Sequence, residues 1–263
     1  MSMFTGIMTD TWVAGTLVAI VAGVVGLFVV IRRAAFAAHV LPLSAFPGAA
    51  AASLLGVSGL AGLVTFSGLG VLGITRLERW GRREVATALW LAASLGLGTL
   101  LLSRTGQYSQ EVYALLFGEI LGVSRSATLS IAVLTIVAVG TMGVLFRPLL
   151  LDSISPELCE AAGTSSRRME LAFLGVLALS TAMVLPVVGA LMVFSLMTGP
   201  ASCARALTSE PRTAALLSVG LSLTTIWSAI ALSYLSNWPV GFFVGTLAAL
   251  SYAAGRAYRR LAR

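Results

Sequence analysis

Trp12-Val-Ala-Gly-Thr-Leu-Val-Ala-Ile-Val-Ala-Gly-Val-Val-Gly-Leu-Phe-Val-Val-Ile31 is a run of twenty residues without a charged side chain. A helix rises about 1.5 Å per residue, so this run is long enough to cross the roughly 30 Å hydrocarbon core of a bilayer. No basic residue precedes it, so the positive region of a cleaved signal peptide is missing. The sequence therefore predicts a retained membrane helix at 12–31.

Similar apolar runs recur along the chain. Hydrophobic residues make up 58% of the sequence, charged residues only 10%, and the mean hydropathy is +0.97. A soluble domain has about 25% charged residues. We expect an all-α, polytopic membrane bundle of about eight helices that forms a single domain over residues 1–263. The predicted spans are 12–31, 45–66, 85–103, 127–146, 169–185, 187–204, 214–235 and 238–255. We divide the spans 169–185 and 187–204 before Pro186 because proline removes a helix hydrogen bond and favours a break. A single kinked helix over both spans is the alternative.

The arginines predict how the bundle is oriented. Eight spans place both termini on one side, and that side then holds 13 of the 17 basic residues, all of which are arginine. The positive-inside rule therefore predicts that both termini are cytoplasmic. The other side would hold Arg32, Arg33, Arg104 and Arg125. Since a P-loop needs a lysine, the chain is not a conventional ATPase. The sequence has no basic domain with interleaved aromatic residues, so it does not indicate nucleic-acid binding.

The loop between the fourth and fifth spans carries helix signals. It reads Phe146-Arg-Pro-Leu-Leu-Leu-Asp-Ser-Ile-Ser-Pro-Glu-Leu-Cys-Glu-Ala-Ala-Gly163. Ser155 is a good helix cap, Pro156 suits the first helical position, and Gly163 suits the stop. These signals predict a short cytoplasmic amphipathic helix at about 153–163. On these features alone, an ordinary interfacial helix packed on its own bundle is an equal alternative.

This loop resembles the S-F-D-P-E-L-A-R-A-L-G signature of zinc/manganese-type ABC transporter permeases. Further family motifs follow in the family's order over about residues 12–255. Arg32-Arg33-Ala-Ala-Phe36 resembles R-R-M-A-F, Pro47-Gly48 resembles P-G, Phe117-Gly-Glu-Ile-Leu-Gly122 resembles F-G-D-I-L-G, and Val187-Val-Gly-Ala-Leu191 resembles V-V-G-x-L.

The resemblance implies a permease subunit that imports a divalent transition metal and performs no chemistry itself. It implies a complex in the bacterial cytoplasmic membrane with two copies of the chain, two ATPase subunits that bind ATP, and an extracytoplasmic metal-binding protein. In this family the loop at 153–163 is the coupling helix that docks on the ATPase. The implied ATPase-coupling residues are Asp152, Ser155, Pro156, Glu157, Leu158, Ala162 and Gly163.

The resemblance also singles out His39, the chain's single histidine. Between R-R-M-A-F and P-G the family has F-G-D-A-L-S-H, whose Asp and His are four residues apart and share a helix face. Here His39 stands at the Asp position and Leu43 at the His position. The implied metal path therefore has one imidazole per chain, and two in a homodimer. Imidazole without carboxylate favours Zn²⁺ over Mn²⁺ as the cargo.

Three other functions stay open on the sequence. A permease of the same architecture could carry manganese or an iron chelate, with His39 incidental. A secondary transporter is disfavoured because the predicted spans have no acidic residue at their centres. An intramembrane metalloprotease is disfavoured because there is no HExxH pattern. Glu111 and Glu119 are weaker candidates for lining the external mouth.

Overall fold

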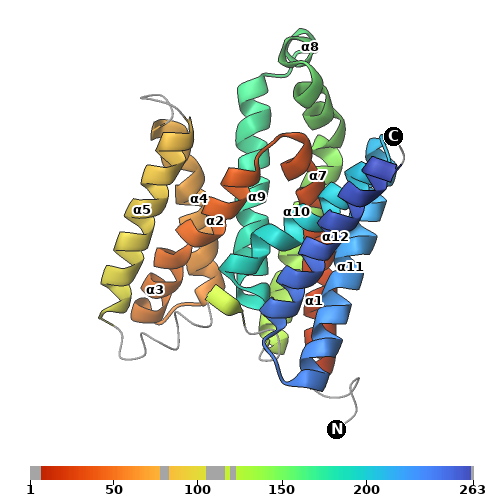
Figure 1. Ribbon diagram of the computed structural model, residues 1–263. Coiled ribbons are helices and arrows are strands. Elements are labelled where there is room, and N and C mark those ends of the chain that lie inside the picture. The colour runs from red at the N-terminus through yellow and green to blue at the C-terminus, as the bar shows by residue number, and fades with distance from the viewer. Residues whose placement is uncertain (1–6, 78–82, 105–115, 119–122, 262–263) are drawn as a thin grey trace.

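The computed structural model describes residues 7–77, 83–104, 116–118 and 123–261, and within these ranges it contains helices and no strands (Figure 1). The all-α prediction is confirmed. The helices are α1 (Ile7–Ile31), α2 (Ala35–Ser44), α3 (Phe46–Leu55), α4 (Gly59–Leu77), α5 (Arg83–Leu102), α7 (Arg125–Ile154), α8 (Pro156–Ala161), α9 (Ser166–Val188), α10 (Ala190–Leu207), α11 (Pro211–Ser236) and α12 (Val240–Leu261).

Eight stretches of the described chain are long and apolar enough to cross a membrane, with α2 and α3 together forming one of them. They also include α1, α4, α5, α7, α9, α11 and α12. Helix α10 adds a further 18 residues, packed between α1, α11 and α12. The chain is therefore a multi-pass membrane protein.

The predicted span at 45–66 is wrong. This stretch contains the turn between α3 and α4, and two separate candidate spans, Ala35–Leu55 and Gly59–Leu77, lie on either side of that turn. Gly56 ends α3 in the left-handed conformation (φ 67°), which costs glycine little. The Ser58 hydroxyl accepts a hydrogen bond from the Ala61 amide (3.3 Å) and caps the start of α4. Apolar residues continue on both sides of this short turn, so hydropathy does not reveal it.

Two other boundaries moved. Helix α9 continues through Pro186 and ends at Gly189 (φ 89°), so α9 and α10 are separate helices whose break lies three residues later than expected. Helix α7 passes Pro148 and continues to Ile154, beyond the predicted end of its span at 146. The additional turns of α7 beyond residue 146 are stabilised because Leu149 and Asp152 are buried against the bundle.

The contacts between helix ends give the direction of each helix. The first turns of α1 meet the last turns of α11, where the rings of Trp12 and Trp227 are 6.5 Å apart. At the last turn of α12, the Arg259 guanidinium donates to the carbonyl of Arg205 at the end of α10 (3.3 Å). Helix α1 therefore begins at the opposite end of the bundle from the end that carries α8 and the last turn of α12 (Figure 1).

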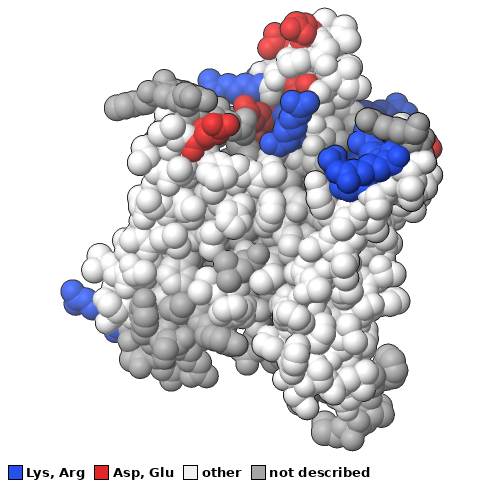
Figure 2. All heavy atoms as spheres, in the orientation of Figure 1, with Lys and Arg blue, Asp and Glu red and all other residues white. Residues whose placement is uncertain are grey.

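The described chain therefore begins and ends at opposite ends of the bundle, which differs from the predicted arrangement with both ends on one side. The cytoplasmic position of the termini stays a prediction. The physical reason for the difference is that the α3–α4 turn divides one predicted span into two candidate spans, while α10, which is not one of the eight candidates, also runs along the bundle from the start of α12 to its end. The same correction moves Arg32 and Arg33, which lie between α1 and α2, to the end that carries α8. Arg104 and Arg125 remain at the opposite end, after α5 and at the start of α7. Figure 2 shows most charged side chains gathered at the α8 end.

Candidate functional site

Helix α8 forms from local interactions that are all visible in the sequence. Ser155 is extended (φ −151°), and its hydroxyl accepts a hydrogen bond from the Leu158 amide (3.3 Å). Pro156 occupies the first turn, where its missing N–H costs nothing. Gly163 (φ 80°) turns the chain after the helix, and its amide donates to the Glu160 carbonyl (2.9 Å). The helix therefore starts at the residue that the capping signals indicated.

The outer face of α8 is partly apolar and partly acidic. Leu158 is 57% exposed, and Ile154 at the end of α7 is 80% exposed. Glu157 and Glu160 are also exposed, as are Ala162 and Gly163 just beyond the helix. We call Ile154, Glu157, Leu158 and Glu160 the α8 surface. It projects beyond the rest of the bundle (Figure 1).

Glu157 stays ionised on this surface. The hydroxyl of Ser155 donates to the Glu157 carboxylate (2.8 Å) and, together with a backbone hydrogen bond, lowers the pKa of that carboxyl below its ordinary value. A lowered carboxyl pKa means that the contribution to folding is present at neutral pH and is lost as the pH falls through the folded-state pKa. The α8 surface therefore keeps its negative charge at physiological pH.

Cys159 is the inward-facing residue of α8 and is fully buried. Burial raises the pKa of its thiol, the carboxylates of Asp152 and Glu160 add to this, and Arg32 partly opposes it. The reactive thiolate is therefore scarce, and reagents cannot reach it.

We expect a water-soluble maleimide at pH 7.5 to leave Cys159 unmodified in the folded protein. Leu158→Cys, one residue away and exposed, should be labelled within minutes under the same conditions. Intact-mass spectrometry measures both. Equal labelling of Cys159 and the introduced cysteine would show that α8 does not pack on the bundle as described.

Asp152 does not belong to the α8 surface. Its side chain is only 2% exposed and forms an ion pair with Arg32, with Nη1 of the arginine 2.7 Å from Oδ2. The resemblance implied that Asp152 is an ATPase-coupling residue, and the structure places it beneath the α8 surface, where its side chain is largely removed from solvent. Sequence analysis missed Arg32 because the predicted topology placed it on the other side of the membrane.

His39 lies on α2 and is partly exposed. Its ring packs edge-on against Phe194 of α10, with centroids 5.5 Å apart. Leu43, one turn further along α2, is also partly buried. The described residues contain no group of three or more His, Cys, Asp or Glu that could hold a metal ion. Among the described residues, His39 belongs to no such group.

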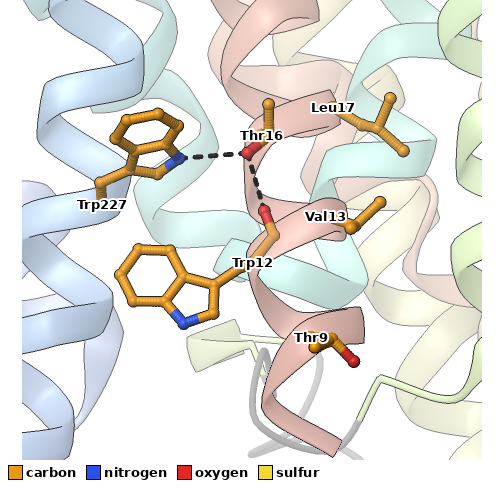
Figure 3. Close-up of a pocket in the computed structure, with 6 residues that line it drawn as sticks. All are labelled: Thr9, Trp12, Val13, Thr16, Leu17 and Trp227. Atoms are coloured by element: carbon orange, nitrogen blue, oxygen red, sulfur yellow. Dashed lines mark hydrogen bonds between the residues drawn. The ribbon is translucent and has the colours of Figure 1, made fainter. Parts of the chain in front are cut away.

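A cavity of about 620 Å³ between α1 and α11 is a poor candidate for a metal path (Figure 3). Its lining includes the indoles of Trp12 and Trp227, and no described residue that lines it is charged. The Thr16 hydroxyl accepts from Trp227 Nε1 (3.1 Å) and donates to the Trp12 carbonyl (2.8 Å), so these groups bond to one another.

Two motifs that are far apart in the sequence meet in the fold. A Cβ atom on Gly118 would collide with the backbone of Val188 and Gly189, and one on Gly189 would collide with Gly118. The segments that resemble F-G-D-I-L-G and V-V-G therefore touch through their glycines. The two acidic candidates, Glu111 and Glu119, lie outside the described residues.

The family model of the ABC 3 transport family matches residues 5–258. This chain belongs to the ABC 3 transport family. An ABC 3 protein of this kind is the membrane subunit of a transporter and not its ATPase. The resemblance stated from the motifs is confirmed.

Curated relatives of this ABC 3 protein carry metal-transport names. The manganese transport system membrane protein MntC of Listeria innocua is 24% identical over 238 residues, which cover 90% of this chain and 85% of MntC. The high-affinity zinc uptake system membrane protein ZnuB of Haemophilus influenzae is 25% identical over 231 residues, which cover 86% of this chain and 88% of ZnuB.

Solved structures share the fold of this ABC 3 protein. PsaBC from Streptococcus pneumoniae, in complex with Fab, matches with a TM-score of 0.88 at 20% identity, covering 98% of this chain and 96% of that chain. An inward-facing metal-chelate type ABC transporter matches with a TM-score of 0.76 at 15% identity, covering 95% and 85%.

Proposed function

We propose that this chain is the permease subunit of an ABC importer for a divalent transition metal, with Zn²⁺ as its cargo. The observation that carries the choice of metal is His39, a partly exposed imidazole on α2 at a family ligand position. Imidazole is a common zinc ligand, whereas manganese prefers oxygen donors. Relatives named for zinc and for manganese both support the transport of a divalent metal.

The proposed complex contains a second copy of this chain, an ATPase subunit that binds ATP, and an extracytoplasmic metal-binding protein. Two copies around a twofold axis would bring two His39 side chains to one path. Two imidazoles, completed by water, make a weak site, which suits an ion that must leave again. ATP would drive transport by binding differently to the outward-open and inward-open states.

The arginines orient the proposed complex. Arg32, Arg33 and most other described arginines lie at the α8 end, which under the positive-inside rule supports a cytoplasmic position for α8 and the end of α12. The start of α1 is then extracytoplasmic. This orientation presents the α8 surface to a cytoplasmic ATPase in the inner membrane of a bacterium.

His39→Ala is expected to reduce ATP-dependent zinc uptake by about tenfold or more, because the substitution removes both imidazoles of the proposed homodimer; a tenfold loss of affinity corresponds to about 1.4 kcal/mol. The measurement is zinc and manganese uptake into proteoliposomes that contain the permease, its ATPase and the binding protein. Leu43→Ala, one turn away on the same helix, is the matched control and should stay within about twofold of wild type.

The outcomes separate the parts of the proposal. Wild-type zinc uptake by His39→Ala would remove His39 from the path and leave the transporter assignment standing. Uptake of manganese but not zinc by the wild-type complex would replace the cargo. Absence of ATP-dependent uptake of either metal would favour the iron-chelate alternative.

A further inference from the structure

A buried ion pair joins the last turn of α7, which leads into α8, to the turn between α1 and α2. The Arg32 guanidinium lies 2.7 Å from Asp152 Oδ2, and the two side chains are 14% and 2% exposed. The same Nη1 atom lies 3.5 Å from the Ser153 hydroxyl. The guanidinium also lies over the ring of Phe173 on α9, 5.3 Å from its centroid. One side chain therefore contacts the end of α7 and the face of α9 at the same time.

The positions of the two partners explain what the pair can transmit. Asp152 lies in the last turn of α7, three residues before the Ser155 cap of α8. Arg32 directly follows α1 and lies three residues before α2, which carries His39. The pair spans 120 residues of sequence, and it directly links the segment that leads into α8 with the segment that leads into α2.

The chemistry of the pair makes it a stiff link. A charge-assisted hydrogen bond between a guanidinium and a carboxylate is short and directional. Because both groups are largely removed from water, separating them would leave an uncompensated buried charge. Asp152 Oδ1 is buried without a hydrogen-bond partner among the described residues, so the carboxylate depends on Arg32 for its main stabilisation. Movement of Asp152 is therefore costly unless Arg32 follows it.

We propose that Arg32 is a positioning residue that carries the movement of α8 to α2 and so to His39. ATP-driven displacement of α8 moves the end of α7, Asp152 draws Arg32 with it, and the α1–α2 turn shifts the start of α2. This inference rests on the proposed function, because only a transporter driven by an ATPase at α8 would start the movement there and pass it to α2. The mechanical link itself needs no assumption about which metal is carried.

The first measurement follows α2 directly and needs no metal. Phe36 on α2 is 45% exposed, whereas both native cysteines are buried, so Phe36→Cys accepts an environment-sensitive fluorophore selectively. In the assembled complex, ATP is expected to change the fluorescence of this label. Arg32→Gln should reduce the change at least threefold, whereas Arg33→Gln, which removes the charge of the exposed neighbouring arginine, should preserve it.

The second measurement is the ratio of metal uptake to ATP hydrolysis in proteoliposomes. Arg32→Gln should hydrolyse ATP but import at least fivefold less metal per ATP than Arg33→Gln. The double variant Arg32→Asp with Asp152→Arg restores an ion pair with the charges exchanged, and it should import more metal per ATP than Arg32→Gln. If Arg32→Gln fails to assemble, Arg32→Lys keeps the charge and should still give a lower ratio than Arg33→Lys.

Two results would overturn the link. One is an ATP-dependent signal from α2 that is as large in Arg32→Gln as in Arg33→Gln. The other is an unchanged ratio in an assembled Arg32→Gln or Arg32→Lys complex. An ATP-dependent signal that requires Arg32, in a complex that moves neither zinc nor manganese, would support the link while contradicting the proposed cargo.

Discussion

Leu158→Arg is expected to separate the ATPase subunit from the permease while leaving the permease folded. Leu158 is exposed in the isolated chain, so the substitution disturbs little in the bundle. In the docked complex, burial of a leucine side chain contributes about 1.5–3 kcal/mol. An arginine left unpaired in the same contact adds a desolvation cost. The total is on the order of 3 kcal/mol or more, which corresponds to binding weaker by about a hundredfold.

Co-purification of the ATPase with a tagged permease measures this effect, and metal uptake should fall in parallel. Leu261→Arg is the matched control, because Leu261 is also exposed at the α8 end but lies at the end of α12. It should retain the ATPase. A Leu158→Arg permease that still co-purifies with a full complement of ATPase would show that the complex docks elsewhere.

Gly26→Ala is expected to prevent stable folding. The added Cβ would overlap the backbone carbonyl of Met197, so α1 and α10 would have to move apart. These two helices pack at the centre of the bundle, where Phe28 and Met197 are fully buried. Overpacking usually costs about 1–3 kcal/mol, and a clash with a backbone carbonyl, which cannot rotate away as a side chain can, places this variant at or above the upper limit.

The measurement is the yield of monodisperse protein and its thermal unfolding temperature in detergent. Gly140→Ala provides the control, because a Cβ on Gly140 of α7 would meet nothing within 4 Å. That variant should be as stable as wild type or slightly more stable, since alanine favours the helix. Equal stability of Gly26→Ala and the wild-type protein would contradict the close approach of α1 and α10.

The proposed coupling machinery divides into a docking part and a linking part. The exposed residues of the α8 surface would bind the ATPase, whereas Asp152 and Arg32 lie beneath and would pass movement on. A substitution on the α8 surface should therefore reduce assembly. A substitution in the ion pair should preserve assembly and reduce transport per ATP. Measuring both quantities on each variant separates the two roles.

The sequence by itself determined the membrane class, most of the helices, the start of α8 and the family. These features depend on composition and on interactions within one turn of helix. The cap of α8 is an example, since Ser155 bonds to the amide of Leu158 three residues later. Such contacts form whatever the rest of the chain does, so a pattern of nearby residues predicts them.

Tertiary structure alone decided where the chain turns between α3 and α4, which helix ends lie together, and the partner of Asp152. The turn after Gly56 interrupts a run that is apolar on both sides, so hydropathy could not place it. That one turn reverses the assignment of Arg32 from one side of the membrane to the other. Arg32 meets Asp152 across 120 residues only because α1 and α7 end at the same level of the bundle, which depends on how the helices pack and not on any local pattern.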